Sequence, residues 1–208
     1  MIKILTALFL STSVLANIVG DTSETIVLTE KQQRLLESGK PVFPPVKEVD
    51  GKGGAATAIF RVKAPTSTVW KVIEDFDQYK NWVDGVKDTV RYEGKDKNKI
   101  YVKFQVGKWF TPTYTYHIVH DYLNKDKGFG TWVLDDEKAN DLTECVGRWH
   151  VSPVKDNPNQ STVEYSVNLQ AKGLVLKIIR PILMKNGVKD ATSWVKKQAE
   201  LLASSEPK

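Results

Sequence analysis

Three histidines and one cysteine are the residues of this chain best suited to metal binding or nucleophilic catalysis. His117 and His120 lie three positions apart in an alternating segment, and an odd separation places two side chains on opposite faces of a β-strand. Cys145 and His150 are five positions apart, with the same consequence. Because neither pair can act on a common atom within its strand, we predict no metal site and no thiol nucleophile.

Acidic residues and short motifs give no catalytic assignment either. The chain contains no Gly-x-Ser-x-Gly nucleophile elbow, no phosphate-binding loop and no dinucleotide fingerprint. Asp75 with Asp77, and Asp135 with Asp136, fall at predicted turns or helix ends, where solvated carboxylates are expected. We therefore predict no catalytic residue and no cofactor.

Between residues 100 and 170, large apolar side chains alternate with polar ones, which is the period of half-buried strands. Tyrosine hydroxyls in such an apolar wall can orient a ligand that carries a polar group. Glu144, Arg148 and His150 share the opposite face of their strand, and we expect this charged face to lie outside. The faces expected to point inward carry Val102, Phe104 and Val106; Tyr114, Tyr116 and Ile118; Cys145, Gly147 and Trp149; and Tyr165, Val167 and Leu169.

Turn-forming residues divide the alternating part of the chain into strands. A first strand is predicted over 55–65, ahead of two helices. Six more strands follow the helices, and the short turns between them require antiparallel neighbours. These six predicted strands cover residues 88–94, 99–107, 111–123, 128–136, 141–153 and 161–172.

Helical periodicity marks the elements that must cover this sheet. Thr29 with Gln32 has the pattern of a capping box and predicts a short helix over 30–38. An apolar stripe ending at Phe76 predicts a helix that begins after Pro65, and a bend and a short helical turn through Trp82 follow. A long C-terminal helix is predicted to begin near Pro181, with Met184, Val188, Ala191, Val195, Ala199 and Leu202 in its apolar stripe.

The N-terminus has the features of a secretory signal peptide, namely one lysine, an apolar run over residues 4–10 and small residues before a cleavage point after Ala16. A membrane anchor is the alternative, although the run is shorter than the ~20 residues of a spanning helix. We predict a signal peptide over 1–16, a flexible leader over 17–27 and a single domain over 28–204. The mature protein is expected to be soluble and exported, either periplasmic or secreted.

Composition narrows the possible partners. The formal net charge is +5, and lysines are interleaved with acidic residues instead of being gathered on one segment. A nucleic-acid interface requires clustered positive charge, so we predict no nucleic-acid partner. The single cysteine, Cys145, excludes an internal disulfide, and we expect a monomer that depends on its hydrophobic core.

The segment "IFRVKAPTSTVWKVIEDFDQYKNWVDGVKD" (59–88) resembles the opening of the START-like, or SRPBCC, superfamily. "VGRWHVSP", "STVEYSVNLQAKG" and the long last helix are similar to the rest of that family, and its polyketide-cyclase and coenzyme-Q-binding-like branch is the nearest. The resemblance covers residues 28–202 and departs from it at Asp84–Gly85, where many relatives have Pro-Gly. It implies an α+β helix-grip fold, in which a curved antiparallel β-sheet wraps around the C-terminal helix and leaves an apolar tunnel between them.

Two interpretations of the inward-facing residues stay open at this stage: they line a cavity, or they fill an ordinary core. The first predicts an exported binding protein for a lipid or other hydrophobic small molecule, with transient membrane contact as a further interaction. A cyclase- or hydratase-type enzyme acting in the same cavity is the alternative, and a protein-interaction module is a third. The predicted ligand-binding residues are Trp70, Phe76, Trp82, Phe104, Tyr114, Tyr116, Trp149, Tyr165, Met184, Val188, Ala191 and Val195.

Overall fold

The computed structural model describes residues 26–44, 47–49, 53–107, 112–177 and 185–205. One short helix and two strands come first in the chain, and a helical pair, six strands and one long helix follow. In chain order they are α1 (Glu30–Glu37), β1 (Lys47–Val49), β2 (Gly53–Val62), α2 (Thr66–Glu74), the 3-10 turn η2 (Phe76–Gln78), α3 (Tyr79–Trp82), β3 (Val86–Tyr92), β4 (Ile100–Val106), β5 (Tyr114–Asp121), the 3-10 turn η3 (Lys125–Lys127), β6 (Phe129–Leu134), β7 (Leu142–Val154), β8 (Asn157–Ala171) and α5 (Lys185–Ser205).

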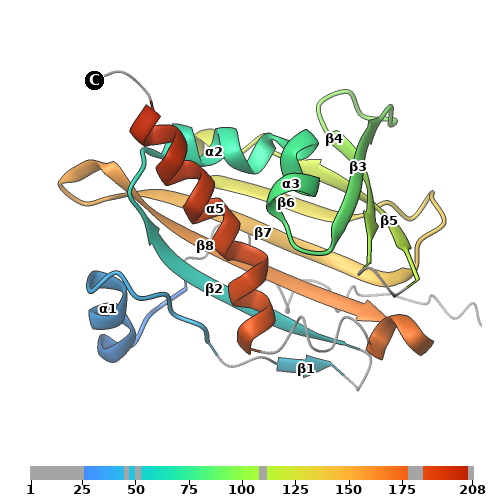
Figure 1. Cartoon of the computed structure of the whole chain (residues 1–208), viewed down its shortest axis with the longest axis horizontal. Helices are drawn as coiled ribbons and strands as arrows, with labels where there is room; N and C mark the ends of the chain where they lie inside the picture. The colour runs from blue at the N-terminus through green and yellow to red at the C-terminus, as the bar shows by residue number, and fades with distance from the viewer. Residues whose placement is uncertain (1–25, 45–46, 50–52, 108–111, 178–184, 206–208) are drawn as a thin grey trace, which may run out of the picture.

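The strands form one antiparallel sheet in the order β1-β2-β8-β7-β6-β5-β4-β3 among the residues that the structure describes. Every neighbouring pair is antiparallel, and β2 joins the sheet beside the last strand, β8. Register shifts in the β3–β4 and β7–β8 pairs mark irregularities that bend strands and increase their twist. Figure 1 shows α5 running across one face of this sheet, with α2 beside it. The predicted helix-grip fold is confirmed.

The helical pair forms as its apolar spacing predicts. Val69, Val72 and Ile73 are buried on one side of α2, and Pro65 occupies the N-cap position. The chain then bends through η2, where Phe76 is fully buried, into the single turn of α3. The Tyr79 hydroxyl donates to the carbonyl oxygen of Ile73 over 2.6 Å, and this bond fixes the bend between the two helices.

Two hydrophobic clusters lie on opposite faces of the sheet. The larger one gathers the inner faces of the strands with α2, α3 and α5. The smaller one is formed by Leu36 of α1, Val42 and the outward-facing Ile59 of β2, with Ile26 and Leu28 packed against it. The predicted capping box is present, because Thr29 accepts from the Gln32 backbone and Gln32 accepts from the Thr29 backbone. Helix α1 therefore covers part of the outer face of the sheet.

Candidate functional site

The inner face of the sheet is lined by aromatic rings that contact one another from strand to strand. Phe104 of β4 stacks on Tyr116 of β5, with ring centroids 5.3 Å apart. On the same face, toward the other edge of the sheet, Tyr165 of β8 contacts Trp149 at 4.6 Å and Trp132 at 5.5 Å. These inward positions follow from strand parity, because side chains two residues apart share a face.

Trp132 was absent from the predicted site, and a glycine on the neighbouring strand explains how its ring fits. Trp132 is paired with Gly147 across β6 and β7. A Cβ atom at Gly147 would lie 2.1 Å from Cζ2 of the indole, so only glycine leaves room for the ring. The sequence predicts that Cys145, Gly147 and Trp149 share an inward-pointing face. The glycine within this face is the feature that could have indicated a large ring on the neighbouring strand.

Most of the predicted ligand-binding residues come together on the inner side of the molecule. Trp70, Phe76, Phe104, Trp149, Val188 and Val195 are buried in the larger cluster, and Trp82, Tyr116 and Tyr165 pack against it while keeping some accessible surface. Tyr114 is also buried, at the start of β5, and Ala191 is partly exposed on α5. Met184 lies outside the described residues.

A second tryptophan missing from the prediction links the helices at one end of this region. Trp194 of α5 is 5% exposed and lies 4.7 Å from the ring of Tyr79. It also stacks on Trp82 of α3 at 6.0 Å. The apolar stripe through Val188, Ala191 and Val195 does not contain position 194, so the helical spacing alone overlooked this anchor.

His120 points inward, whereas His117 lies on the opposite face and contacts Asn140 through its ring nitrogen at 3.2 Å. The His120 ring lies 4.6 Å from that of Phe76 and 6.3 Å from that of Trp132. The Tyr122 hydroxyl is 3.3 Å from its Nδ1, and its Nε2 is sealed from solvent without a hydrogen-bond partner. Burial, assisted by the positive charge of Arg91, lowers the pKa of His120 to about 3.

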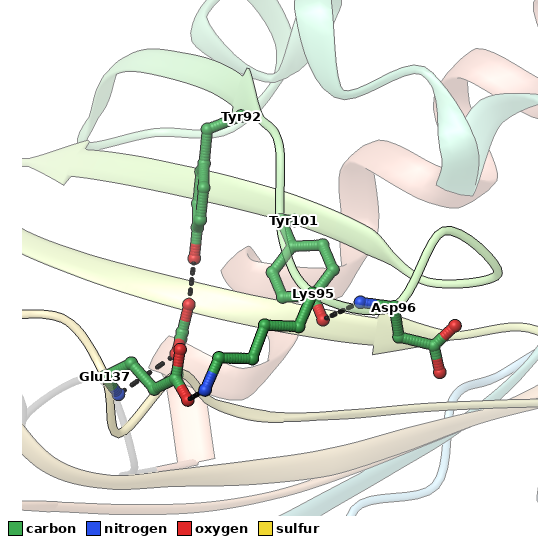
Figure 2. Close-up of polar contacts among 6 residues, drawn as sticks. Tyr92, Lys95, Asp96, Tyr101 and Glu137 are labelled. Atoms are coloured by element: carbon green, nitrogen blue, oxygen red, sulfur yellow. Dashed lines mark hydrogen bonds and ion pairs between the residues drawn. The ribbon is translucent and has the colours of Figure 1, made fainter.

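The tyrosine hydroxyls fall into two groups. Figure 2 shows the outer pattern, in which the Tyr92 hydroxyl donates to Asp135 over 2.6 Å and the Tyr101 hydroxyl accepts from the Asp96 backbone over 3.1 Å. Inside, burial raises the pKa of both Tyr116 and Tyr165. Neither inner hydroxyl has a hydrogen-bond partner among the residues that the structure describes, and neither belongs to the polar atoms sealed from solvent. These two phenols are therefore deep in the molecule and still accessible.

The inward-facing thiol is poorly suited to nucleophilic chemistry. Cys145 is 6% exposed, and burial raises its pKa to about 12, so the sulfur is a neutral thiol at physiological pH. A thiolate is the reactive form of cysteine. Within the described part of the chain, no three histidine, cysteine or acidic side chains are grouped so that they could hold a metal ion.

The charged face of β7 that the sequence predicts to lie outside is opposite the aromatic interior. Part of this face is nevertheless shielded from solvent. Arg148 is 3% exposed and donates to Glu164, itself 4% exposed, over 2.5 Å. Glu164 also accepts from the backbone of Ile26 over 3.4 Å. The chain that leads into α1 thus packs over this ion pair, a covering that strand parity cannot reveal.

A groove of about 430 Å³ lies beside this ion pair, between α1 and the outer face of the sheet. Because it is on the opposite side of the sheet from α5, it is not the predicted cavity. Apolar and polar side chains both line it, and His150 stacks on Phe129 at 4.3 Å at this face. The groove is lined by Ile26, Leu28, Glu30, Gln33, Leu36, Ile59, Arg61, His150, Ser152, Thr162 and Glu164.

Among the described residues, no helix is both long and apolar enough to cross a membrane. No curated protein is significantly similar to the chain in sequence.

Solved structures share its architecture at low identity. The Zhui aromatase/cyclase from Streptomyces sp. R1128 is 12% identical with a TM-score of 0.59, and the match covers 74% of this chain and 98% of that one. A START superfamily protein from Mycobacterium smegmatis is 14% identical with a TM-score of 0.55, covering 71% and 98%. A STAR-related lipid transfer protein from Xanthomonas axonopodis is 14% identical with a TM-score of 0.54, covering 76% and 98%. Likeness at this level establishes the fold.

Family membership rests on the sequence itself. Residues 62–191 match the family described as polyketide cyclase/dehydrase and lipid transport, and this range runs from the end of β2 into α5. That match spans more than half of the chain and contains the inner faces of β3 to β8. The family's description names lipid transport beside polyketide cyclases and dehydrases. The chain belongs to the polyketide cyclase/dehydrase and lipid transport family.

Proposed function

We propose that this protein is an exported binding protein for a lipid or other hydrophobic small molecule, held between the sheet and α5. The observation that carries the proposal is the state of Tyr116 and Tyr165. Both side chains lie deep enough for burial to raise the pKa of their hydroxyls, yet both keep accessible surface. Closely packed interiors leave few voids, so this combination supports an interior space beside the two rings.

The placement of α5 supports the same proposal. Helix α5 makes its closest approaches to α2 and to the strand β2, which lies near one edge of the sheet. A helix touches a concave sheet along a line, so the curved inner face beyond that line remains for other groups to cover. A ligand placed there would meet Phe104, Tyr116 and Trp132. Each methylene that it buried would contribute ~0.8 kcal/mol.

Export is the second part of the proposal, and it rests on the sequence of residues 1–16. A protein that carries a hydrophobic molecule through an aqueous compartment must shield that molecule from water. An interior site lined by aromatic side chains suits this task, because a bound chain would be surrounded on all sides.

Native mass spectrometry of the protein purified from its own exporting cells tests both parts of the proposal. We expect the folded protein to carry extra mass that is released on denaturation, and the released polypeptide to begin after Ala16. A folded protein without any associated molecule, together with an intact Met1, would contradict the proposal.

A cyclase- or hydratase-type enzyme is the second candidate, and the inward orientation of His120 is the observation that favours it. Such an enzyme needs an acid or base that reaches its substrate. The pKa of His120 is about 3, which makes the imidazole a weak base, and its Nε2 is sealed. The binding role therefore ranks first. Conversion of the co-purified molecule during incubation, abolished by His120→Leu, would instead establish the enzyme.

A further inference from the structure

The groove under α1 has three polar side chains in line across its floor. Strand register places Arg61 of β2, Thr162 of β8 and Ser152 of β7 side by side on three neighbouring strands. All three line the groove of about 430 Å³, and we call them the polar row. A groove of this volume is within the range of sites that hold small molecules.

The polar row has hydrogen-bond donors that a ligand could use. The Arg61 guanidinium donates to the Thr162 hydroxyl, which is its one side-chain contact among the described residues. Because that hydroxyl accepts this bond, its own O–H can still donate. The Ser152 hydroxyl has no partner in the same part of the chain, and all three side chains are half-buried.

Arg61 is also the groove's unbalanced charge. Two carboxylates line the groove, those of Glu30 and Glu164. Glu164 forms the buried ion pair with Arg148, and Glu30 lies 3.5 Å from Arg34. Among the described residues, no carboxylate forms an ion pair with Arg61. The groove therefore has one positive charge available to an anion.

Apolar side chains form another wall of the groove. Ile26 and Leu28, in the chain before α1, pack with Leu36 of α1 and Ile59 of β2, and we call these four the apolar wall. Ile26 and Leu28 are only partly buried, so apolar surface remains accessible. The Ile26 backbone N–H donates to Glu164 over 3.4 Å, which holds this wall against the sheet. An apolar body placed here is stabilised by the area that it buries.

The chemistry of the polar row favours a carboxylate. The planar fork of a guanidinium matches the two oxygens of a carboxylate, to which the hydroxyls can also donate. His150, the other basic side chain of the groove, is neutral at physiological pH because burial lowers its pKa. A singly charged anion is therefore balanced. An amine would meet the like charge of Arg61, and an alcohol would gain no ion pair.

We propose that this groove is a second binding site, separate from the interior one, for a small carboxylate with an apolar body, such as a medium-chain fatty acid. The carboxylate accepts hydrogen bonds from the polar row, and the apolar body lies against the apolar wall. An uncharged long chain forms no ion pair here, so the two sites differ in the ligand that they take.

Calorimetric titration of the purified protein tests this selectivity. Octanoate, octylamine and 1-octanol have alkyl chains of similar length, and at neutral pH the first carries a negative and the second a positive charge. We expect octanoate to bind about tenfold or more tightly than either of the others, the difference expected for one charge-assisted hydrogen bond. Amide NMR signals of Ile26, Ile59 and Thr162 should shift as octanoate is added.

Three variants locate the site. Arg61→Gln removes the charge and should lower the affinity for octanoate about tenfold while leaving that for 1-octanol unchanged. Leu28→Glu adds a negative charge to the apolar wall and should weaken octanoate binding without weakening octylamine binding. Lys103→Gln is the matched control, because it removes one positive charge from the outer face of β4, away from the groove, and should bind octanoate as the wild type does.

Competition with the neutral fluorescent polyene diphenylhexatriene, a probe of the interior, keeps the two sites apart. If octanoate displaces the polyene and binds Arg61→Gln as tightly as the wild type, it occupies the interior, and this inference is overturned while the proposed function stands. No octanoate binding, or equal affinity for octanoate and octylamine, also overturns it. Arg61-dependent binding in a protein that takes up no polyene would support the groove site and contradict the proposed function. Melting curves show which variants are folded, and the wild-type amide signals locate octanoate whatever the variants do.

Discussion

His120 shows how burial sets the chemistry of a single side chain. Its ring is surrounded by Phe76, Phe104, Tyr122 and Trp132, and no acidic group is among the causes of its pKa shift. The imidazole therefore remains neutral in the folded protein. Unfolding exposes the ring to water and returns it to its ordinary pKa of 6.5.

This difference predicts an acid sensitivity that belongs to His120. The folded pKa is depressed to about 3, so the unfolded chain binds the proton first. Stability is complete above pH 6.5 and is lost as the pH falls toward 3, at ~1.4 kcal/mol per pH unit. Between pH 7.5 and pH 5, the wild-type protein should thus lose about 2 kcal/mol more than His120→Leu in urea unfolding.

His117→Leu is the comparison variant for this prediction, since it removes a histidine from the other face of the same strand. Equal pH dependence in the wild-type protein and in His120→Leu would show that water or a charge partner reaches the ring.

Single residues also show what the sequence could and could not predict. Strand parity correctly placed Phe104, Tyr116, Trp149 and Tyr165 on one side, because alternation is a local property of the chain. It gave no reason to place Trp132 in the site, since that depends on the pairing of Trp132 with Gly147. Long-range register of this kind has no signature in a single strand.

At the scale of elements, the proposal depends most on which side chains of the C-terminal helix face the interior of the molecule. Val188 and Val195 are buried on one side of α5, and Ala191 lies one turn from each of them. If an interior space lies beside α5, a small side chain at this point of the stripe would leave room for a ligand. Packed cores, in contrast, favour bulk at such positions.

Ala191→Trp tests this element. If Ala191 borders the interior space, the new indole should occupy it, and the affinity for diphenylhexatriene should fall about tenfold or more while the melting temperature changes little. Lys197→Trp, on the exposed side of α5, is the control and should bind as the wild type does. If the position is ordinary core, overpacking should instead cost about 1–3 kcal/mol of stability and leave probe binding unchanged.

The helices and strands themselves could largely be predicted from the sequence. The segments that pack over them could not. The capping box at Thr29 and the stripe through Phe76 depend on neighbours three or four residues away, and both predictions were confirmed. That α1 and the chain before it would cover Arg148 and Glu164 depends on contacts over 138 residues, such as the bond from Ile26 to Glu164. Such a contact is decided by tertiary packing and leaves no local pattern.

For the whole molecule, the two faces of the sheet present two different places for a small molecule. The outer groove under α1 is open and carries charged side chains, among them Arg61 and Glu164. The inner face is aromatic, and the Tyr116 and Tyr165 hydroxyls on it have no hydrogen-bond partner among the described residues. A hydrophobic chain is stabilised by the apolar area that it buries, which favours the inner face. The central claim is therefore that the ligand lies between the inner face of the sheet and α5.

The most direct test of that claim is a crystal structure of the protein with a long-chain hydrophobic molecule that carries bromine at one end, located by the anomalous scattering of the bromine. We predict that the bromine peak lies between the inner face of the sheet and α5, in the region of Phe104, Tyr116 and Trp132. A bromine peak in the outer groove beside His150 and Glu164, or an interior filled by side chains with no peak, would contradict the account.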